Sequence, residues 1–140
     1  MQDQEWYSAI QSFFEEKIAF DRYLGMRVLD VRRGEVEFAL PYREEFLGDP
    51  FRPALHGGVV ATLIDAAAGA AALSTLPFGS LCSTLDMRVD YLLPGRPEEL
   101  RAQAKVIRSG NSVAVVNVEV TQASDLIATG RAVFSLKPKA

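Results

Sequence analysis

The apolar residues near the start of the chain recur at helical spacing. They are separated by three or four residues, and charged or polar residues fill the positions between them. Asp3 stands where a helix N-cap is expected. The pattern predicts an amphipathic helix over residues 4–20, with one apolar face made by Trp6, Ile10, Phe13, Phe14 and Ile18.

Short runs rich in Val, Leu, Met and Phe predict six strands. The first two, residues 25–30 and 35–40, flank Arg33-Gly34 and should form a hairpin. Residues 41–55 contain three prolines and are expected to form a loop. Hairpin turns then separate four longer runs, so an antiparallel meander is expected at residues 81–93, 99–108, 112–122 and 126–136.

Residues 57–76 form the most apolar segment, and they predict a long helix that begins near His56 and ends at about Leu76, before Pro77 and Gly79. Twenty residues of this kind are also long enough to cross a bilayer. Ala and Gly dominate the segment, however, and Asp65 near its centre opposes insertion by ~3 kcal/mol. We therefore expect a helix buried inside the protein and no membrane span.

The order of elements is helix, two strands, long apolar helix, four strands. The chain of 140 residues suits one domain, residues 1–140, and an antiparallel sheet curled around the apolar helix would bury it. Other α+β arrangements, such as a ferredoxin-like sandwich, normally carry two helices of similar polarity, whereas these two differ. The open sheet leaves free edges, which pairing between subunits would cover.

Composition narrows the possible partners. A net charge of −3 provides no broad positive surface for DNA or RNA. The single cysteine, Cys82, makes no internal disulfide, and the first residues lack a signal-peptide pattern, so a cytoplasmic location is expected. One His and one Cys do not provide the usual ligands for a catalytic metal, and no cofactor is expected.

Asp65 is the residue on which the functional prediction depends. A carboxylate in apolar surroundings needs dedicated partners, or it is retained for chemistry. It either caps a loop or pairs with an arginine, or it reacts with a ligand. On a helix it shares a face with Gly58, Thr62 and Gly69, where the small residues leave room for a ligand. Close packing of the helix against a strand would explain the same small residues.

His56-Gly57-Gly58 precedes this helix. The first turn of a helix presents free backbone N–H groups, and glycines let a ligand oxygen approach them. Donors of this kind commonly contribute ~3 kcal/mol to acyl transfer. An oxyanion site is therefore predicted here, with His56 steadying the same oxygen or the loop.

These residues resemble the phenylacetate-pathway (PaaI-type) branch of hotdog acyl-CoA thioesterases. The resemblance extends over about residues 20–137 and includes residues 84–91, which are similar to the family's central strand. It implies a hotdog fold, an acyl-CoA substrate, Asp65 as nucleophile or general base and Gly57 as oxyanion donor. It further implies that Thr84 orients the attacking water and that His56 supports the thioester carbonyl. Asp49 stands near a position where related sequences often carry Asn, and it is left out of the site.

Helix geometry predicts that the site is shared. Gly57 and Asp65 are eight residues apart, or roughly 12 Å along one helix, and cannot both reach one carbonyl. A two-fold dimer with antiparallel helices would bring Gly57 of one chain to Asp65 of the other. We expect a dimer as the minimal active unit and a tetramer as the full assembly.

Basic residues are candidates for binding the CoA phosphates, although each is also an ordinary surface charge. They are Arg88, Lys105, Arg108 and Arg131, with backbone donors at Ser109, Gly110 and Asn111. The acyl pocket is expected to include Phe46, Leu47 or Phe51. Two other functions stay open: a hotdog hydratase or dehydratase, which would normally use a catalytic His, and a non-catalytic acyl-CoA-binding module.

Overall fold

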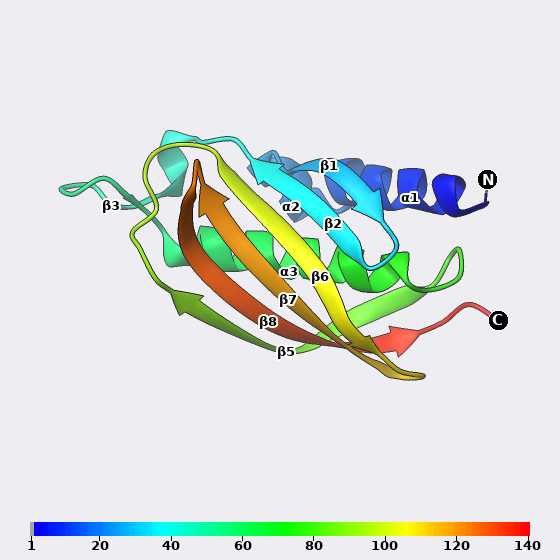
Figure 1. Ribbon diagram of the computed structural model, residues 1–140. Helices are drawn as coiled ribbons and strands as arrows, with labels where there is room; N and C mark the ends of the chain where they lie inside the picture. Colours follow the sequence, from blue (N-terminus) through cyan, green and yellow to red (C-terminus); the bar gives the residue numbers. More distant parts are fainter. Residues whose placement is uncertain (1) are drawn as a thin grey trace.

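The computed structural model describes residues 2–140 (Figure 1). Three α-helices, a π-helical turn and the six strands of one sheet account for most of residues 2–140. In chain order the elements are α1 (Gln2–Ser12), the π-helical turn η1 (Phe13–Lys17), α2 (Ala19–Leu24), β1 (Arg27–Arg32), β2 (Glu35–Leu40), the 3-10 turn η2 (Glu44–Phe46), β3 (Leu47–Asp49), β4 (Ala54–Leu55), α3 (Gly57–Ser74), β5 (Leu81–Tyr91), β6 (Leu100–Ser109), β7 (Val113–Gln122) and β8 (Asp125–Lys137).

The six predicted strands form one antiparallel sheet in the order β1-β2-β6-β7-β8-β5. The sheet curves around α3, which lies along its concave face (Figure 1). Side chains on alternate positions of β6, β7 and β8 are buried against the helix, as the alternating strand pattern requires. The predicted α+β fold, a central helix wrapped by an antiparallel sheet, is confirmed.

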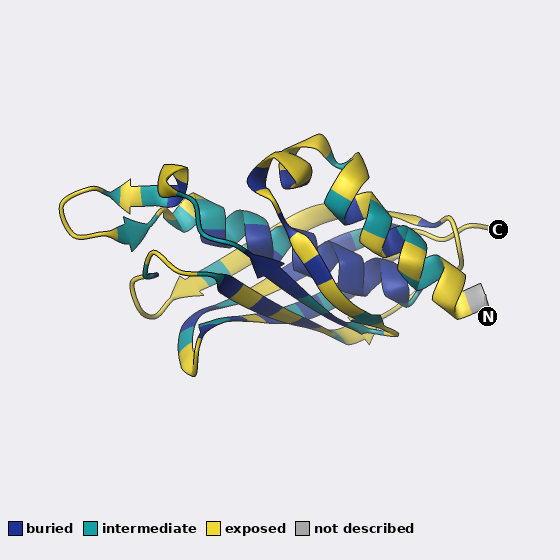
Figure 2. Ribbon diagram, turned by 90° about the horizontal axis from the view of Figure 1, so that it is seen from above, coloured by how far each residue is buried: buried dark blue, intermediate teal, exposed yellow. Residues whose placement is uncertain are grey.

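Helix α3 is buried on most sides from Leu63 onwards (Figure 2). A Cβ on Gly130 of β8 would lie 2.6 Å from a methyl carbon of Ile64, so glycine is needed where the helix approaches the sheet. By length and composition α3 is a candidate membrane span, but 67% of it is buried inside the molecule. Burial by the sheet therefore accounts for its apolar composition.

The N-terminal segment differs from the predicted single helix over residues 4–20. α1 ends at Ser12, and the five residues of η1 follow with a π-type hydrogen bond from the Ile18 N–H to the Phe13 carbonyl, 3.0 Å long. The backbone of Ile18 is extended, and α2 starts after it. Helical periodicity over these seventeen residues does not reveal such a break, because a π turn adds only one residue to a helical turn.

The predicted loop over residues 41–55 contains regular structure. β3 and β4 form a small hairpin, which leads directly into α3. Asp49 shapes its turn, because its carboxylate accepts hydrogen bonds from the N–H groups of Phe51 and Arg52 at 2.9 and 3.1 Å. These two hydrogen bonds hold the pKa of Asp49 below its usual value. Asp49 is therefore a turn residue, which agrees with its omission from the site.

Strand β5 lies at one edge of the sheet and pairs only with β8 within residues 2–140. Eight of its eleven residues are exposed, unlike the half-buried strands beside it. Leu81, Leu85 and Tyr91 are apolar or aromatic side chains among them. A long exposed edge with apolar side chains is typical of a surface that another chain covers.

Candidate active site

Asp65 and Thr84 come together across the space between α3 and β5. The Thr84 hydroxyl donates a hydrogen bond of 2.7 Å to the Asp65 carboxylate. Thr84 faces the helix because its strand partner in register is Phe134, which is buried on the concave side of the sheet. The sequence suggested each residue separately, and the strand register of β5 explains why they meet.

The Asp65 side chain lines a cavity of about 440 Å³. No arginine or lysine of residues 2–140 forms an ion pair with it. The possibility of a structural Asp65–Arg pair within the chain is therefore wrong. Most of the lining is apolar, and it consists of Phe14, Ile18, Phe20, Asp21, Ala61, Thr62, Asp65, Ala66, Gly69, Thr84, Met87 and Phe134.

The start of α3 is held in place by its own side chains. His56 is the N-cap, and its Nδ1 accepts a 2.8 Å hydrogen bond from the Gly58 N–H. An accepting Nδ1 leaves the proton of the neutral ring on Nε2. The Tyr91 hydroxyl donates to the Gly57 carbonyl at 2.7 Å. The Gly57 N–H is the first of the helix and has no partner within it.

Glycine at position 57 leaves room for Tyr91, which covers the helix start. A Cβ on Gly57 would lie 3.2 Å from a ring carbon of Tyr91, closer than an ordinary contact. Tyr91 was not among the predicted site residues, because an aromatic residue at a strand end gives no signal of its own in the sequence. Tyr91 thus holds the Gly57–Gly58 peptide group, which directly follows the predicted N–H donor.

The predicted small-residue face of α3 is present, and its residues have different environments. Thr62 and Gly69 line the cavity with Asp65, whereas Gly58 lies outside it. The Thr62 hydroxyl donates to the Gly58 carbonyl at 2.7 Å. Gly69 is buried, and a Cβ there would lie 3.5 Å from Phe134 and 3.7 Å from Phe14. Close packing and a ligand cavity therefore occur together on this face.

Asp21 is a site residue that the sequence reasoning missed. It lies in the short helix α2, is 6% exposed and lines the same cavity as Asp65. Burial, with a smaller contribution from the Asp65 charge, raises the pKa of Asp21 to about 6. Its position four residues before Gly25, which ends the short helix, was the available signal, but an acidic residue in an amphipathic segment is usually solvated.

Cys82 lies next to this region without taking part in the predicted chemistry. Its Sγ is 3.8 Å from the Gly69 carbonyl oxygen. Burial, and then the Asp65 charge, raise the pKa of the thiol to about 11. The protonated thiol dominates at neutral pH, so Cys82 is a poor nucleophile.

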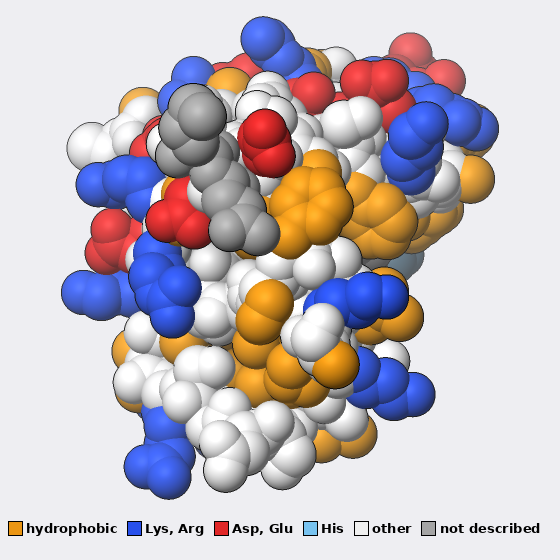
Figure 3. Space-filling model, turned by 90° about the vertical axis from the view of Figure 1, so that its right-hand side faces the viewer, with side chains coloured by type: hydrophobic (Ala, Val, Ile, Leu, Met, Phe, Trp, Pro, Cys, Tyr) orange, Lys and Arg blue, Asp and Glu red, His pale blue; other side chains and the backbone are white. Residues whose placement is uncertain are grey.

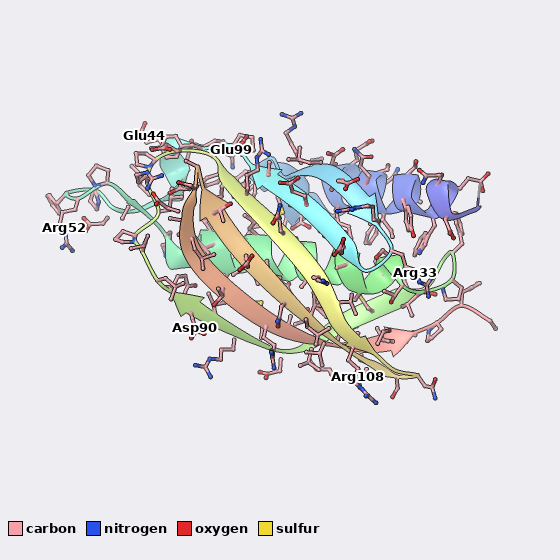
Figure 4. The ribbon with its side chains drawn as sticks, viewed as in Figure 1. Arg33, Glu44, Arg52, Asp90, Glu99 and Arg108 are labelled. Atoms are coloured by element: carbon pink, nitrogen blue, oxygen red, sulfur yellow. The ribbon has the colours of Figure 1, made fainter. Side chains whose placement is uncertain are left out.

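Most candidates for binding CoA phosphates lie away from the cavity within one chain. Arg88 pairs in register with Arg131 on the outer face of the sheet and forms an ion pair with Asp90 at 3.3 Å. Arg108 lies at the opposite end of the sheet from Arg52 and the β3–β4 hairpin (Figure 4). The Ser109 hydroxyl is 3.4 Å from that of Thr75, beyond the end of α3. One chain therefore does not bring these residues to Asp65.

The residues suggested for the acyl pocket, Phe46, Leu47 or Phe51, do not line this cavity within one chain. Phe51 is 93% exposed at the tip of the β3–β4 hairpin, and Phe46 packs under Arg43. Leu47 also lies outside the cavity. The aromatic side chains of the lining come from the N-terminal segment and β8 instead, because the π turn brings Phe14 over Gly69.

A long helix held in the concave face of a six-stranded antiparallel sheet is the hotdog fold. The chain belongs to the thioesterase superfamily, whose family model matches residues 53–129, and it is a thioesterase. The match includes the start of α3, Asp65 and Thr84.

Similar proteins agree with this placement. The chain is 36% identical over 142 residues to the medium/long-chain acyl-CoA thioesterase YigI of Escherichia coli K12, with 89% of this chain and 90% of that protein covered. A phenylacetic acid degradation-related protein of Ralstonia eutropha JMP134 has a similar crystal structure, with a TM-score of 0.80, 26% identity and coverage of 93% and 98%. A thioesterase-superfamily-related protein of Shewanella oneidensis gives a TM-score of 0.83, 28% identity and coverage of 95% and 96%.

Proposed function

We propose that this enzyme hydrolyses acyl-CoA thioesters to free acid and CoA, with Asp65 as the catalytic carboxylate. The main support is the placement of Asp65, which opens into an apolar cavity and accepts a hydrogen bond from Thr84. An apolar cavity of about 440 Å³ suits an acyl group. The name of the similar E. coli enzyme supports acyl-CoA as the substrate class.

Asp65 acts either as a general base or as a nucleophile. As a general base, it takes a proton from water while the water oxygen bonds to the carbonyl carbon, and the C–S bond then breaks. As a nucleophile, its oxygen bonds to the carbonyl carbon and CoA leaves, after which water hydrolyses the mixed anhydride. In both routes the CoA thiolate takes up one proton, and the products are the acid and the CoA thiol.

The thioester carbonyl is placed at the start of α3. Its oxygen accepts a hydrogen bond from the Gly57 N–H, which stabilises the tetrahedral oxyanion. The Nε2–H of His56 is a second donor at this position, since Nδ1 is engaged by Gly58. Thr84 keeps one carboxylate oxygen of Asp65 in place, and its lone pairs accept a hydrogen bond from the attacking water.

The active unit is a dimer. Gly57 and Asp65 lie on one uninterrupted helix, so about 12 Å separates them along its axis. Each must come within about 3 Å of the same carbonyl, so they belong to neighbouring chains. Pairing through the exposed edge of β5 would set two copies of α3 antiparallel and create two equal sites. Further pairing of dimers into a tetramer remains our expectation.

The CoA phosphates are bound by basic residues that the dimer brings to the site. Arg88, Arg108 and the Ser109-Gly110-Asn111 turn are the proposed contacts, and because none of them lines the cavity of its own chain, they would come from a neighbouring chain. Residues 1–140 are proposed to act as one domain. The cytoplasmic location stays a prediction from the sequence.

The single histidine argues against a hydratase or dehydratase. Its Nδ1 is engaged with the Gly58 N–H of its own helix, and neither Asp65 nor another carboxylate of residues 2–140 pairs with the ring. A non-catalytic acyl-CoA-binding module would need no carboxylate in the cavity. The Asp65–Thr84 pair therefore favours hydrolysis over both alternatives.

The test is CoA-thiol release from short, medium, long and aryl acyl-CoAs by wild type and Asp65→Asn. We expect kcat to fall at least ~100-fold in the variant while acyl-CoA still binds in calorimetry. Asp30→Asn is the matched control, because Asp30 is an exposed carboxylate in an ion pair on β1. Equal rates for wild type and Asp65→Asn would remove Asp65 from the mechanism. Tight binding without turnover by wild type would identify a binding module.

A further inference from the structure

A second apolar cavity lies behind the one that contains Asp65. Its volume is about 310 Å³, and it lies between α1, the end of α3 and the start of β5. Its lining is almost entirely apolar and consists of Trp6, Ala9, Ile10, Phe13, Phe14, Leu73, Gly79, Ser80, Leu81 and Cys82. Hydrophobic side chains also gather on the end of the molecule where the chain starts (Figure 3).

Among the residues that the structure describes, Phe14 alone lines both cavities. Its ring is 5% exposed and packs edge-on against Phe13 and Phe38, with ring centroids 5.4 and 5.7 Å away. A Cβ on Gly69 would be 3.7 Å from the tip of this ring. The Phe14 ring therefore stands between the two cavities and rests on the bare backbone of α3.

The two cavities follow one face of α3. Asp65, Gly69 and Leu73 are four residues apart, so they lie one above another at steps of about 6 Å. Asp65 and Gly69 line the first cavity and Leu73 lines the second. An acyl chain that starts at Asp65 and follows this face meets the Phe14 ring after about one helical turn.

We propose that Phe14 sets the length of acyl chain that this enzyme accepts. Its ring ends the acyl pocket at Gly69, and the cavity behind it has the apolar lining and position to hold the end of a longer saturated chain. This inference rests on the proposed acyl-CoA hydrolysis. The step from Gly69 to Leu73 corresponds to about five methylene groups of an extended chain.

The position of Phe14 depends on the π turn. The extra residue in this turn shifts the side chains of Phe13 and Phe14 relative to α1, so that Phe13 is 42% exposed while its neighbour is buried. π turns inside helices are frequent at functional sites, and this one places an aromatic ring in the path of the substrate.

The test measures kcat/KM for saturated acyl-CoAs of increasing length with wild type, Phe14→Ala and Phe13→Ala. In Phe14→Ala we expect the preferred chain to lengthen by about four to six carbons, because the two cavities join. Phe13→Ala is the matched control and should keep the wild-type profile, since it enlarges only the cavity behind the Phe14 ring.

A second pair of variants tests whether the rear cavity is occupied. Ala9→Phe in the Phe14→Ala background places a ring in that cavity from α1, and we expect it to restore the wild-type chain-length profile. Phe14→Leu is the milder variant if Phe14→Ala folds poorly, and a smaller shift toward longer chains is expected from it.

The failures of the two proposals are distinguishable. An unchanged chain-length profile in folded Phe14→Ala or Phe14→Leu, with acyl-CoA still hydrolysed, overturns the role of Phe14 alone. The same shift in Phe13→Ala also overturns it, because the effect then does not depend on the dividing ring. Absence of acyl-CoA hydrolysis by wild type overturns the proposed function and this inference together.

Discussion

Replacing Thr84 by valine tests the hydrogen bond that holds the Asp65 carboxylate. Valine has nearly the same shape but cannot donate to the oxygen now 2.7 Å from the Thr84 hydroxyl. A hydrogen bond to a charged group contributes about 1.5–3 kcal/mol. Loss of the whole amount would lower kcat by about 10- to 150-fold. Thr84 is exposed in the single chain, so water replaces part of the bond and we expect a decrease of about 10- to 30-fold.

The assay is steady-state release of the CoA thiol, with urea unfolding in parallel. KM and the unfolding free energy should change little, because the exposed hydroxyl is not part of the core. Thr84→Ser is the matched control, since it keeps the donor and removes only a methyl group. A kcat for Thr84→Val within about twofold of wild type would refute the positioning role. An equal decrease in Thr84→Ser would assign the effect to packing instead.

Two further predictions concern the helix start and the buried carboxyl. His56→Ala removes the side chain that accepts from the Gly58 N–H, so we expect a loss of about 0.5–2 kcal/mol in unfolding free energy in urea. His56→Asn can still cap the helix, so its unfolding free energy should decrease clearly less than that of His56→Ala. Equal decreases in the two variants would contradict the capping role. Asp21→Asn removes a carboxylate whose pKa burial raises from 3.8 to about 6, so the variant should be more stable above pH 6 by roughly 1–3 kcal/mol. Asp21 loses its proton near pH 4 in the unfolded chain and near pH 6 in the folded one, so the stability gain of Asp21→Asn should decrease as the pH falls from 6 to 4 and vanish below pH 4. A stability difference between variant and wild type that stays constant from pH 4 to 8 would contradict this role of burial.

The sheet and its central helix could be predicted from the sequence because each has one dominant pattern. The strands of β6, β7 and β8 alternate between buried and exposed positions, and turn residues separate them. Helix α3 is apolar on nearly every side, so other parts of the protein must bury it on nearly every side. Its boundaries differ from the prediction by no more than two residues, the usual uncertainty of helix ends.

The cavity could be predicted only in part. Asp65 could be predicted as a site residue because a single charge among apolar residues is energetically costly. Thr84 could be predicted only from the family resemblance. The contributions of Phe14 and Asp21 depend on the π turn and on the extended backbone of Ile18, which reposition the N-terminal segment against α3. Both deviations come from tertiary packing, and helical periodicity gives no indication of them.

The central claim is that each active site combines Gly57 of one chain with Asp65 of another. Gly57→Pro removes the proposed N–H donor at the first helical position, where proline is well tolerated. Gly57→Ala is its matched control, because it adds similar crowding at Tyr91 but keeps the N–H. Gly57→Pro and Asp65→Asn should each be nearly inactive alone, whereas Gly57→Ala should retain more activity than Gly57→Pro.

Mixing the two inactive proteins gives the most direct test. After equimolar unfolding and refolding, half of the random dimers contain one chain of each kind, and each such dimer has one intact site. The shared site therefore predicts recovery of about a quarter of the wild-type thiol-release rate per chain. No recovery, with mixed dimers demonstrated by mass, would contradict the shared site.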